Sequence, residues 1–221
     1  MSLDNKKAKR SAPFRSGKGT VKRQPPSLAT RSKAVGVVRI VGGKFKRSVL
    51  PVEDREGLRP TPERVRETLF DWLTHLTGGL SGLCVCDMFA GSGALGLEAA
   101  SRGAHQAVIL EKDRRGAARI QAVVDKLSAG DIVQVCCVDS FLWLKTTDKS
   151  FDIIFIDPPF DAKLHAKATQ SALERLKPDG MLYMENDALL DDEWLATLGL
   201  IAVRRGKAGA VHYLLAERKT V

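Results

Sequence analysis

The feature that most constrains the fold is a series of short apolar segments that alternate with helix-like segments from residue 83 onward. The apolar segments are candidates for strands, at residues 83–89, 107–110, 132–138, 151–156 and 181–184. Strands that are apolar on both faces and separated by helices form parallel sheets that are covered on both sides. The sequence therefore predicts an α/β fold with a mostly parallel sheet.

Helices are predicted at residues 94–102, 115–127, 162–176 and 192–198. Pro178-Asp179-Gly180 predicts the end of the third helix before the next strand begins. Residues 201–204 and 211–216 can pair as an antiparallel hairpin across Gly206–Gly209. We find no internal repeat, so one α/β domain with N-terminal additions is expected.

Residues 61–76 predict a helix that comes before the first strand of this domain. Thr61 is the expected N-cap, and Pro62 suits the first helical position. Three arginines, Arg59, Arg64 and Arg66, cluster about the start of the helix, where they could meet phosphate or a substrate. We expect all three to contact nucleic acid.

Residues 35–60 form a separate segment that begins with a predicted β-hairpin. Gly42-Gly43 is the expected turn. The basic residues of this hairpin surround Phe45, and they are Arg39, Lys44, Lys46 and Arg47. Such a surface suits phosphates and a stacked base. The alternative is a solvated edge hairpin whose lysines prevent aggregation.

Residues 1–34 contain the entire net charge of +9, because they hold ten Lys and Arg residues and one acidic residue, Asp4. The rest of the chain holds 25 basic and 25 acidic residues. With few large apolar side chains, this segment is expected to be a disordered tail. It could attract RNA through counterion release, be a solvated extension without a role, or be an organellar transit peptide.

The composition excludes several other classes of protein. No stretch approaches the roughly 18 apolar residues that span a bilayer. The four cysteines, Cys84, Cys86, Cys136 and Cys137, lie in apolar runs without zinc-site spacing, so we expect buried, reduced thiols and no metal. A cytoplasmic protein, with a monomer as the expected state, fits this pattern.

A glycine-rich turn follows the first strand, in the sequence Asp87-Met88-Phe89-Ala90-Gly91-Ser92-Gly93. Its glycines match the dinucleotide fingerprint, and Glu111 lies 20 residues after Gly91, at the end of the next strand. Taken alone, this pattern permits an NAD-dependent oxidoreductase.

Asp87 favours S-adenosylmethionine over a dinucleotide as the cofactor. A carboxylate directly before the turn would repel a pyrophosphate, whereas S-adenosylmethionine carries an ammonium and a sulfonium that it attracts. Glu111 would then accept the ribose hydroxyls. Asp139, with Ser140 beside it, would accept from the adenine amine; the alternative for Asp139 is a helix N-cap. The expected cofactor-binding residues are Asp87, Phe89, Ala90, Gly91, Ser92, Gly93, Glu111, Asp139 and Ser140.

The fourth strand ends in Asp157-Pro158-Pro159-Phe160, at the edge of the sheet where the cofactor residues are expected. The two prolines fix the backbone, so that carbonyl and carboxylate oxygens can accept from an exocyclic amine. Such acceptors would aim the nitrogen lone pair at a methyl group, and Phe160 would stack on the base. The alternative is an ordinary turn, but its position beside the predicted cofactor site favours catalysis.

At these residues the chain resembles the bacterial 16S rRNA guanine-N2 methyltransferase family, over residues 37–217. The markers are Arg39–Lys44, Leu58–Thr61, Arg64–Phe70, Phe89–Ala99 and Asp157–Phe160. The resemblance implies the Rossmann-like fold of class I methyltransferases, with a mostly parallel seven-stranded sheet covered by helices on both faces. It implies a methyltransferase domain at 61–221, catalysis at Asp157–Phe160, and RNA contacts within 39–68. Its implied partner is 16S rRNA in the small ribosomal subunit or an assembly intermediate.

Three rival functions stay open at this stage. An N6-adenine methyltransferase could use the same acceptors, although Asp rather than Asn at position 157 resembles the guanine enzymes. The NAD oxidoreductase is disfavoured by Asp87. A non-enzymatic RNA-binding assembly factor is disfavoured by the intact motif at residues 157–160.

Overall fold

The computed structural model describes residues 38–52, 61–159 and 162–219. The predicted tail at residues 1–34, Arg59 and Phe160 lie outside these described residues. None of the helices within these ranges is long and apolar enough to cross a membrane.

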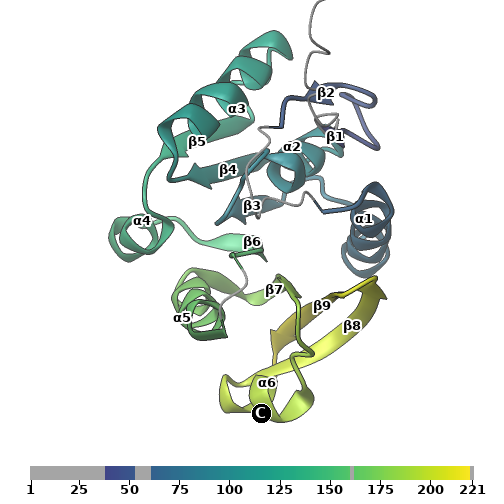
Figure 1. The fold of residues 1–221 in the computed structure, drawn as a ribbon, viewed down its shortest axis with the longest axis vertical. Helices are drawn as coiled ribbons and strands as arrows, with labels where there is room; N and C mark the ends of the chain where they lie inside the picture. The colour runs from purple at the N-terminus through teal and green to yellow at the C-terminus, as the bar shows by residue number, and fades with distance from the viewer. Residues whose placement is uncertain (1–37, 53–60, 160–161, 220–221) are drawn as a thin grey trace, which may run out of the picture. The chain divides into compact units, whose positions relative to one another are not determined.

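Seven strands form one sheet in the spatial order β5-β4-β3-β6-β7-β9-β8 (Figure 1). The strands are β3 (Cys84–Asp87), β4 (Gln106–Glu111), β5 (Val133–Cys137), β6 (Phe151–Ile156), β7 (Leu176–Asn186), β8 (Leu200–Ala208) and β9 (Val211–Arg218). Strands β3 to β7 pair in parallel, and β9 pairs antiparallel with both β7 and β8. The predicted sheet and the predicted C-terminal hairpin are therefore both confirmed.

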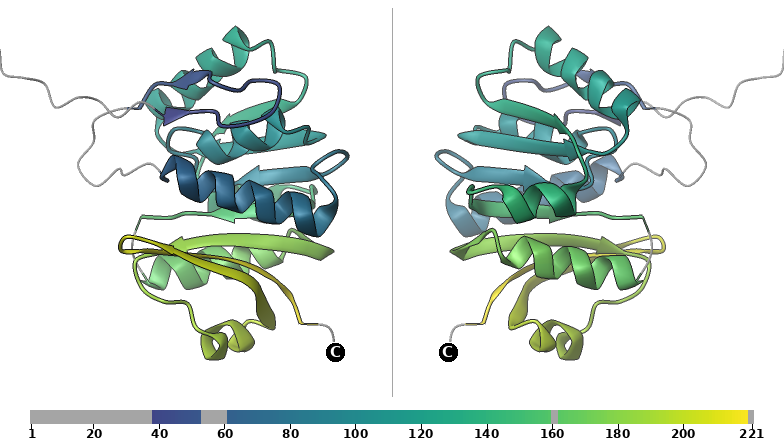
Figure 2. Two further views of the ribbon diagram at one scale, coloured as in Figure 1. Left: turned by 90° about the vertical axis from the view of Figure 1, so that its right-hand side faces the viewer. Right: turned by 90° about the vertical axis from the view of Figure 1, so that its left-hand side faces the viewer.

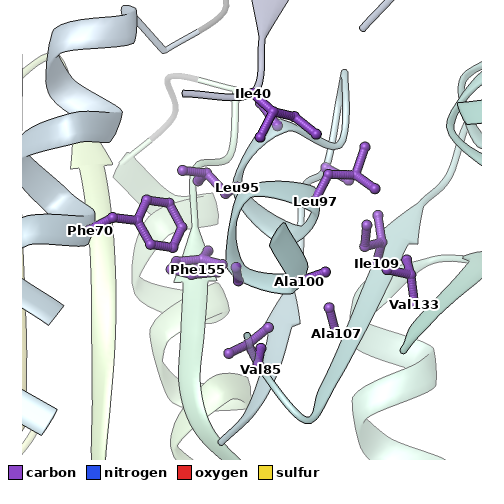
Figure 3. Packing of buried hydrophobic residues seen from close by; sticks show 14 of the residues in the cluster. Ile40, Phe70, Val85, Leu95, Leu97, Ala100, Ala107, Ile109, Val133 and Phe155 are labelled. Atoms are coloured by element: carbon purple, nitrogen blue, oxygen red, sulfur yellow. The ribbon is translucent and has the colours of Figure 1, made fainter. Parts of the chain in front are cut away.

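Helices cover both faces of the sheet, as the two side views in Figure 2 show. One face carries α1 (Glu63–Thr77), α2 (Ala94–Ser101) and α3 (Arg114–Lys126), and the other carries α4 (Ser140–Thr146), α5 (Ala162–Leu173) and α6 (Asp192–Thr197). In Figure 3, Phe70 of α1 points towards Phe155 of β6, and their ring centroids are 6.0 Å apart. Each face of the sheet thus has its own apolar core, which explains why the strands are apolar throughout.

The third predicted helix is too long, because α5 ends at Leu173 and β7 begins at Leu176. Pro178-Asp179-Gly180, which was expected to separate the helix from the strand, lies inside β7. The pairing of β7 with β6 shifts register between Phe151 and Ile153, so the extra residues form an irregularity in the strand. A proline can lie in a sheet at such an irregularity, where no ladder hydrogen bond is needed from its nitrogen.

The expectation that all four cysteines are buried is correct only in part. All four thiols are free and lie in β3 and β5. Cys86 is buried, Cys84 and Cys136 are partly buried, and Cys137 is exposed. Strand β5 is at the edge of the sheet, so Cys137 has a neighbouring strand on one side only, where it pairs with Glu111 of β4.

The N-terminal hairpin consists of β1 (Val38–Arg39) and β2 (Val49–Leu50), which pair antiparallel. Its connection is longer than the predicted Gly42-Gly43 turn, because the glycines dock onto α2 instead. Gly43 has φ +73°, and a Cβ there would lie 1.9 Å from the carbonyl oxygen of Ser101. Only glycine allows this close approach.

Glu98 of α2 holds the hairpin and two helices together. Its carboxylate accepts hydrogen bonds from the backbone nitrogens of Val41 and Gly42, each at 2.7 Å. It also pairs with Arg66 of α1 at 3.4 Å and with Arg102 at 2.8 Å, and it is fully buried. The hairpin therefore depends on one buried negative charge in α2.

We predict that Glu98→Gln destabilises the protein by about 3 kcal/mol, because it removes the ion-pair partner of the buried Arg66 and directs an amide N–H group at other donors. Urea unfolding measures the change. The matched control is Glu67→Gln on the exposed face of α1, which should change stability by less than about 0.5 kcal/mol. Equal, small effects from both substitutions would contradict this role of Glu98.

Candidate functional site

Four strands end at one edge of the sheet, where a cavity of about 430 Å³ opens. Asp87 is the last residue of β3 and Glu111 the last of β4, while Asp139 and Asp157 follow β5 and β6. All four carboxylates line this cavity. Parallel pairing brings them together, because it places the carboxyl ends of these strands on the same side.

The glycine-rich turn forms one wall of the cavity. Gly91 has φ +55°, and its nitrogen donates to Oε2 of Glu111 at 2.9 Å. The other oxygen of Glu111 accepts from the nitrogen of Asp113 at 2.7 Å. The carboxylate of Glu111 therefore fixes the turn and also faces the cavity. Phe89, Ala90, Gly91 and Ser92 line the wall, as the prediction requires of cofactor-binding residues.

Gly93 has a structural role instead of lining the cavity. It is buried, with φ +75°, and is the N-cap of α2. A Cβ at this position would lie 3.0 Å from the side chain of Ile120 in α3. Gly93 thus lies outside the cavity lining, and its role as a cofactor contact stays a prediction.

Asp87 is buried at the base of the cavity, with 2% of its surface exposed. Burial raises the pKa of its carboxyl group to about 7, although the hydrogen bond from the Gly96 nitrogen opposes this shift. The nearby Glu111 carboxylate raises the pKa further. A cation bound beside Asp87 would reverse this effect, because an opposite charge favours the ionised form.

Asp139 is the N-cap of α4, which was the alternative interpretation of this residue. Its Oδ1 accepts from the nitrogens of Phe141 and Leu142, at 3.1 and 3.2 Å. Its Oδ2 lies 3.5 Å from Nζ of Lys112. Both Asp139 and the buried Ser140 still line the cavity, so the cap and a contact with a ligand are compatible.

The motif that follows β6 forms the opposite wall through Asp157, Pro158 and Pro159. Burial raises the pKa of Asp157 well above its usual range, and the neighbouring carboxylates Glu185 and Asp87 raise it further. The nearby hydroxyl of Thr61 lowers the pKa of Asp157 in part. An acceptor with a raised proton affinity thus faces the cavity.

Several residues of the cavity were missed by the sequence reasoning, among them Thr61, Lys112, Phe141 and Leu164. Thr61 was expected to cap α1, but the N-cap is Pro62, without a side-chain hydrogen bond. Oγ1 of Thr61 instead donates to the buried Glu185 at 2.9 Å. Phe141 makes an edge contact with Phe89 at 5.9 Å between centroids, and its position directly after the expected Asp139-Ser140 pair was a signal that could have indicated it.

The predicted RNA-contacting residues divide into two groups. Five of them are exposed, namely Arg39, Lys44, Lys46, Arg47 and Arg64. Arg66 is not available, because it is 2% exposed and its guanidinium donates to the carbonyl of Arg39 and to Glu98. Phe45 is 6% exposed and packs in the apolar core, so the expected base-stacking role is wrong for the folded hairpin.

Comparisons with known proteins show which family this chain resembles. The family model described as Conserved hypothetical protein 95 matches residues 38–217. The Ribosomal RNA small subunit methyltransferase D of Escherichia coli K12 is 37% identical over 191 residues, which cover 83% of this chain and 91% of that protein. The protein of the same name from Buchnera aphidicola subsp. Baizongia pistaciae is 33% identical, covering 85% of this chain and 95% of its own length.

The chain belongs to the ribosomal RNA small subunit methyltransferase D family. The solved structure of the Escherichia coli protein yhhF, 34% identical, superposes with a TM-score of 0.72 and covers 83% of this chain and 99% of that one. The magnesium protoporphyrin IX methyltransferase of Synechocystis PCC 6803 shares the fold at 18% identity, with a TM-score of 0.57 over 70% of this chain and 78% of that one. The predicted Rossmann-like methyltransferase fold and enzyme class are confirmed.

We predict that Asp87→Asn removes a pH-dependent cost of folding in the cofactor-free protein. The pKa of Asp87 rises from 3.8 to about 7 on folding, so the folded state holds this proton more tightly than the unfolded chain. The penalty is therefore absent below about pH 4, grows between about pH 4 and pH 7, and stays constant at higher pH. The free energy of unfolding of the variant, relative to that of the wild type, should therefore be up to about 4 kcal/mol larger at high pH than at low pH.

Urea unfolding between about pH 4 and pH 8 tests this expectation. The control is Asp131→Asn, at an exposed position, whose effect should not depend on pH in this way. A constant difference between Asp87→Asn and the wild type across the range would contradict it.

Proposed function

We propose that the chain transfers a methyl group from S-adenosylmethionine to the exocyclic N2 amine of one guanine in 16S rRNA during assembly of the small ribosomal subunit. The observation that supports this most is that Asp157-Pro158-Pro159 lines the same cavity as Asp87 and Glu111. The names of the relatives supply the class of substrate. The resemblance to the 16S rRNA guanine-N2 methyltransferase family, carried by the motifs quoted above, implies the N2 atom and guanine 966 as its position.

The cavity fits a cationic nucleoside better than a dinucleotide. Asp87 and Glu111 would repel a pyrophosphate, but they attract the ammonium and sulfonium groups of S-adenosylmethionine. In this proposal Glu111 accepts from the ribose hydroxyls, and Asp139 with Ser140 lies at the adenine. Phe89 and Phe141 give this part of the cavity an apolar surface. The bound cofactor would supply an electrophilic methyl group on positively charged sulfur.

The residues after β6 would prepare the amine for attack. The lone pair of an exocyclic amine is delocalised into the base, so the nitrogen is a poor nucleophile. Acceptors at Asp157 and at the carbonyl of a proline hold its N–H bonds and favour a pyramidal nitrogen. Preset acceptors also orient the lone pair without reorganisation during the reaction. A guanine in an RNA helix must swing out of the helix to reach such a cavity.

The RNA would lie across the exposed basic residues near the N-terminal end of the described chain. Lys44, Lys46 and Arg47 project from the hairpin, and Arg64 lies on the exposed face of α1. Hydrogen bonds tie the hairpin to α2 through Glu98 and Ser101. These charges can therefore position RNA phosphates relative to the protein surface.

We predict that Asp157→Ala lowers the rate of methyl transfer by at least about 100-fold, while the affinity for S-adenosylhomocysteine changes little. The variant loses the acceptor for the amine but keeps the glycine-rich turn and Glu111. Transfer of labelled methyl groups to small subunits that lack the modification measures the rate, and calorimetry measures the affinity.

The matched control is Asp179→Ala, an exposed position at the opposite end of β7, which should leave both quantities unchanged. Mass-spectrometric mapping of the product then identifies the modified base. N6-methyladenosine in place of N2-methylguanosine would favour the adenine enzyme, and tight binding of NAD alone would remove the proposal.

We also predict that deletion of residues 1–34 weakens RNA binding mainly at low salt, because this segment contains the whole net positive charge. The slope of log affinity against log salt should fall by about 0.7 for each single-strand phosphate contact that is lost. The control keeps the length of the segment and replaces its ten Lys and Arg residues by Gln. Binding that stays the same at every salt concentration would exclude an electrostatic role.

A further inference from the structure

Glu185 lies beside the catalytic motif but is not explained by the site described above. Strands β6 and β7 pair Ile156 with Met184, so Asp157 and Glu185 are the next residues on neighbouring parallel strands. Glu185 is 3% exposed. Asp157 and Thr61 line the cavity, and the Thr61 hydroxyl donates to Oε1 of Glu185 at 2.9 Å. A buried carboxylate thus supports the wall that holds the reacting acceptor.

Three contacts fix the position of Glu185. Besides the bond from Thr61, its Oε1 accepts from the hydroxyl of Tyr183 at 2.8 Å. Its backbone carbonyl is hydrogen-bonded to Nε2 of His165 on α5. Hydrogen bonds to both its side chain and its backbone therefore hold the Glu185 carboxylate in one orientation. A residue that acts through a neighbouring group needs such support.

The Thr61 hydroxyl is close to both carboxyl groups: it donates its single hydrogen to Oε1 of Glu185, and it is near enough to Asp157 to influence the pKa of that group. The charged and titratable groups around this pair come from five elements: Arg66 of α1, Asp87 of β3, His165 of α5, Tyr183 of β7 and, next to Tyr183, Tyr213 of β9. Arg66 and the two hydroxyls favour the ionised form of Glu185. The ionised form is thus better stabilised at Glu185 than at Asp157.

We propose that Glu185 is a positioning residue for the proposed reaction: its carboxylate, fixed beside Asp157, makes Asp157 a stronger acceptor for the proton that the amine loses. The inference rests on the proposed function. Two neighbouring buried carboxyl groups repel each other when both are ionised. The negative charge on Glu185 therefore increases the proton affinity of Asp157. A base is most effective when its proton affinity matches the working pH, so a carboxylate with a raised proton affinity accepts the amine proton more readily than an ordinary aspartate does.

The step balances without any further reactant. The amine nitrogen forms a bond to the methyl carbon while the bond between that carbon and sulfur breaks, and its electron pair remains on sulfur. The nitrogen then carries a positive charge. An N–H bond breaks, its electron pair returns to nitrogen, and the proton forms an O–H bond on Asp157. Water takes this proton after the product leaves.

The test is Glu185→Gln, which removes the charge but keeps an oxygen that accepts from Thr61 and Tyr183. We expect the carboxyl group of Asp157 to titrate at a pH lower by about one unit or more. Carbon-13 NMR of the cofactor-free protein, with the signal assigned through Asp157→Asn, measures this shift. The acid limb of the pH–rate profile should move to lower pH by a similar amount, and the plateau rate should fall because Asp157 becomes a weaker base.

A second variant does not depend on how well Glu185→Gln folds. Tyr183→Phe removes a hydroxyl that donates to Oε1 of Glu185 and favours the ionised form of Glu185, so both the titration of Asp157 and the acid limb should move to lower pH, by less than in Glu185→Gln. Glu193→Gln, on the exposed surface of α6, is the matched control and should shift neither. A purely structural role for Glu185 would lower the rate without moving the limb.

Two outcomes separate this inference from the proposed function. If Asp157 titrates at the same pH in the wild type and in Glu185→Gln, the role of Glu185 is overturned, whatever the protein methylates. If the wild type transfers no methyl group to small subunits, yet Glu185→Gln still shifts the titration of Asp157, the coupling of the two carboxyl groups stands and the proposed function fails.

Discussion

The parallel pairing of β3, β4 and β6 is the constraint on which the site depends. Strand β3 is between the other two, with Val85 opposite both Ala107 and Ile153. This register makes the strands end together, so Asp87, Glu111 and Asp157 face one cavity. Both faces of the sheet are covered by helices, and the same arrangement that creates the core also excludes water from the base of the site.

Exclusion of water makes it unfavourable to ionise the carboxyl groups at this edge of the sheet. Asp87, Asp157 and Glu185 are carboxyl groups whose pKa values are all raised, in each case chiefly by burial. In the empty protein these groups repel one another, and a bound cation relieves the repulsion. The site is therefore less favourable for folding than an apolar one would be, and this strain is consistent with a pocket built for a positively charged ligand.

Glu98 is also a buried carboxylate, but it is compensated, because cations and backbone donors surround it. It joins Arg66, Arg102 and the hairpin into one network. The basic hairpin is consequently a fixed part of the domain. The network orients the exposed lysines of the hairpin, whereas Asp87 and Asp157 of the other site face the cavity.

The sequence by itself determined the order of the strands and helices, the sheet edge of the site and the acidic residues there, because strand periodicity and glycine turns are local signals. It could not show that Thr61 reaches Glu185 or that Arg66 is buried against Glu98, because these partners are distant in the chain and meet only through packing. A local N-cap pattern predicted one bond for Thr61, and a buried carboxylate more than a hundred residues away offered a stronger one. Only the tertiary structure decides between such competing partners, since their relative energies depend on burial.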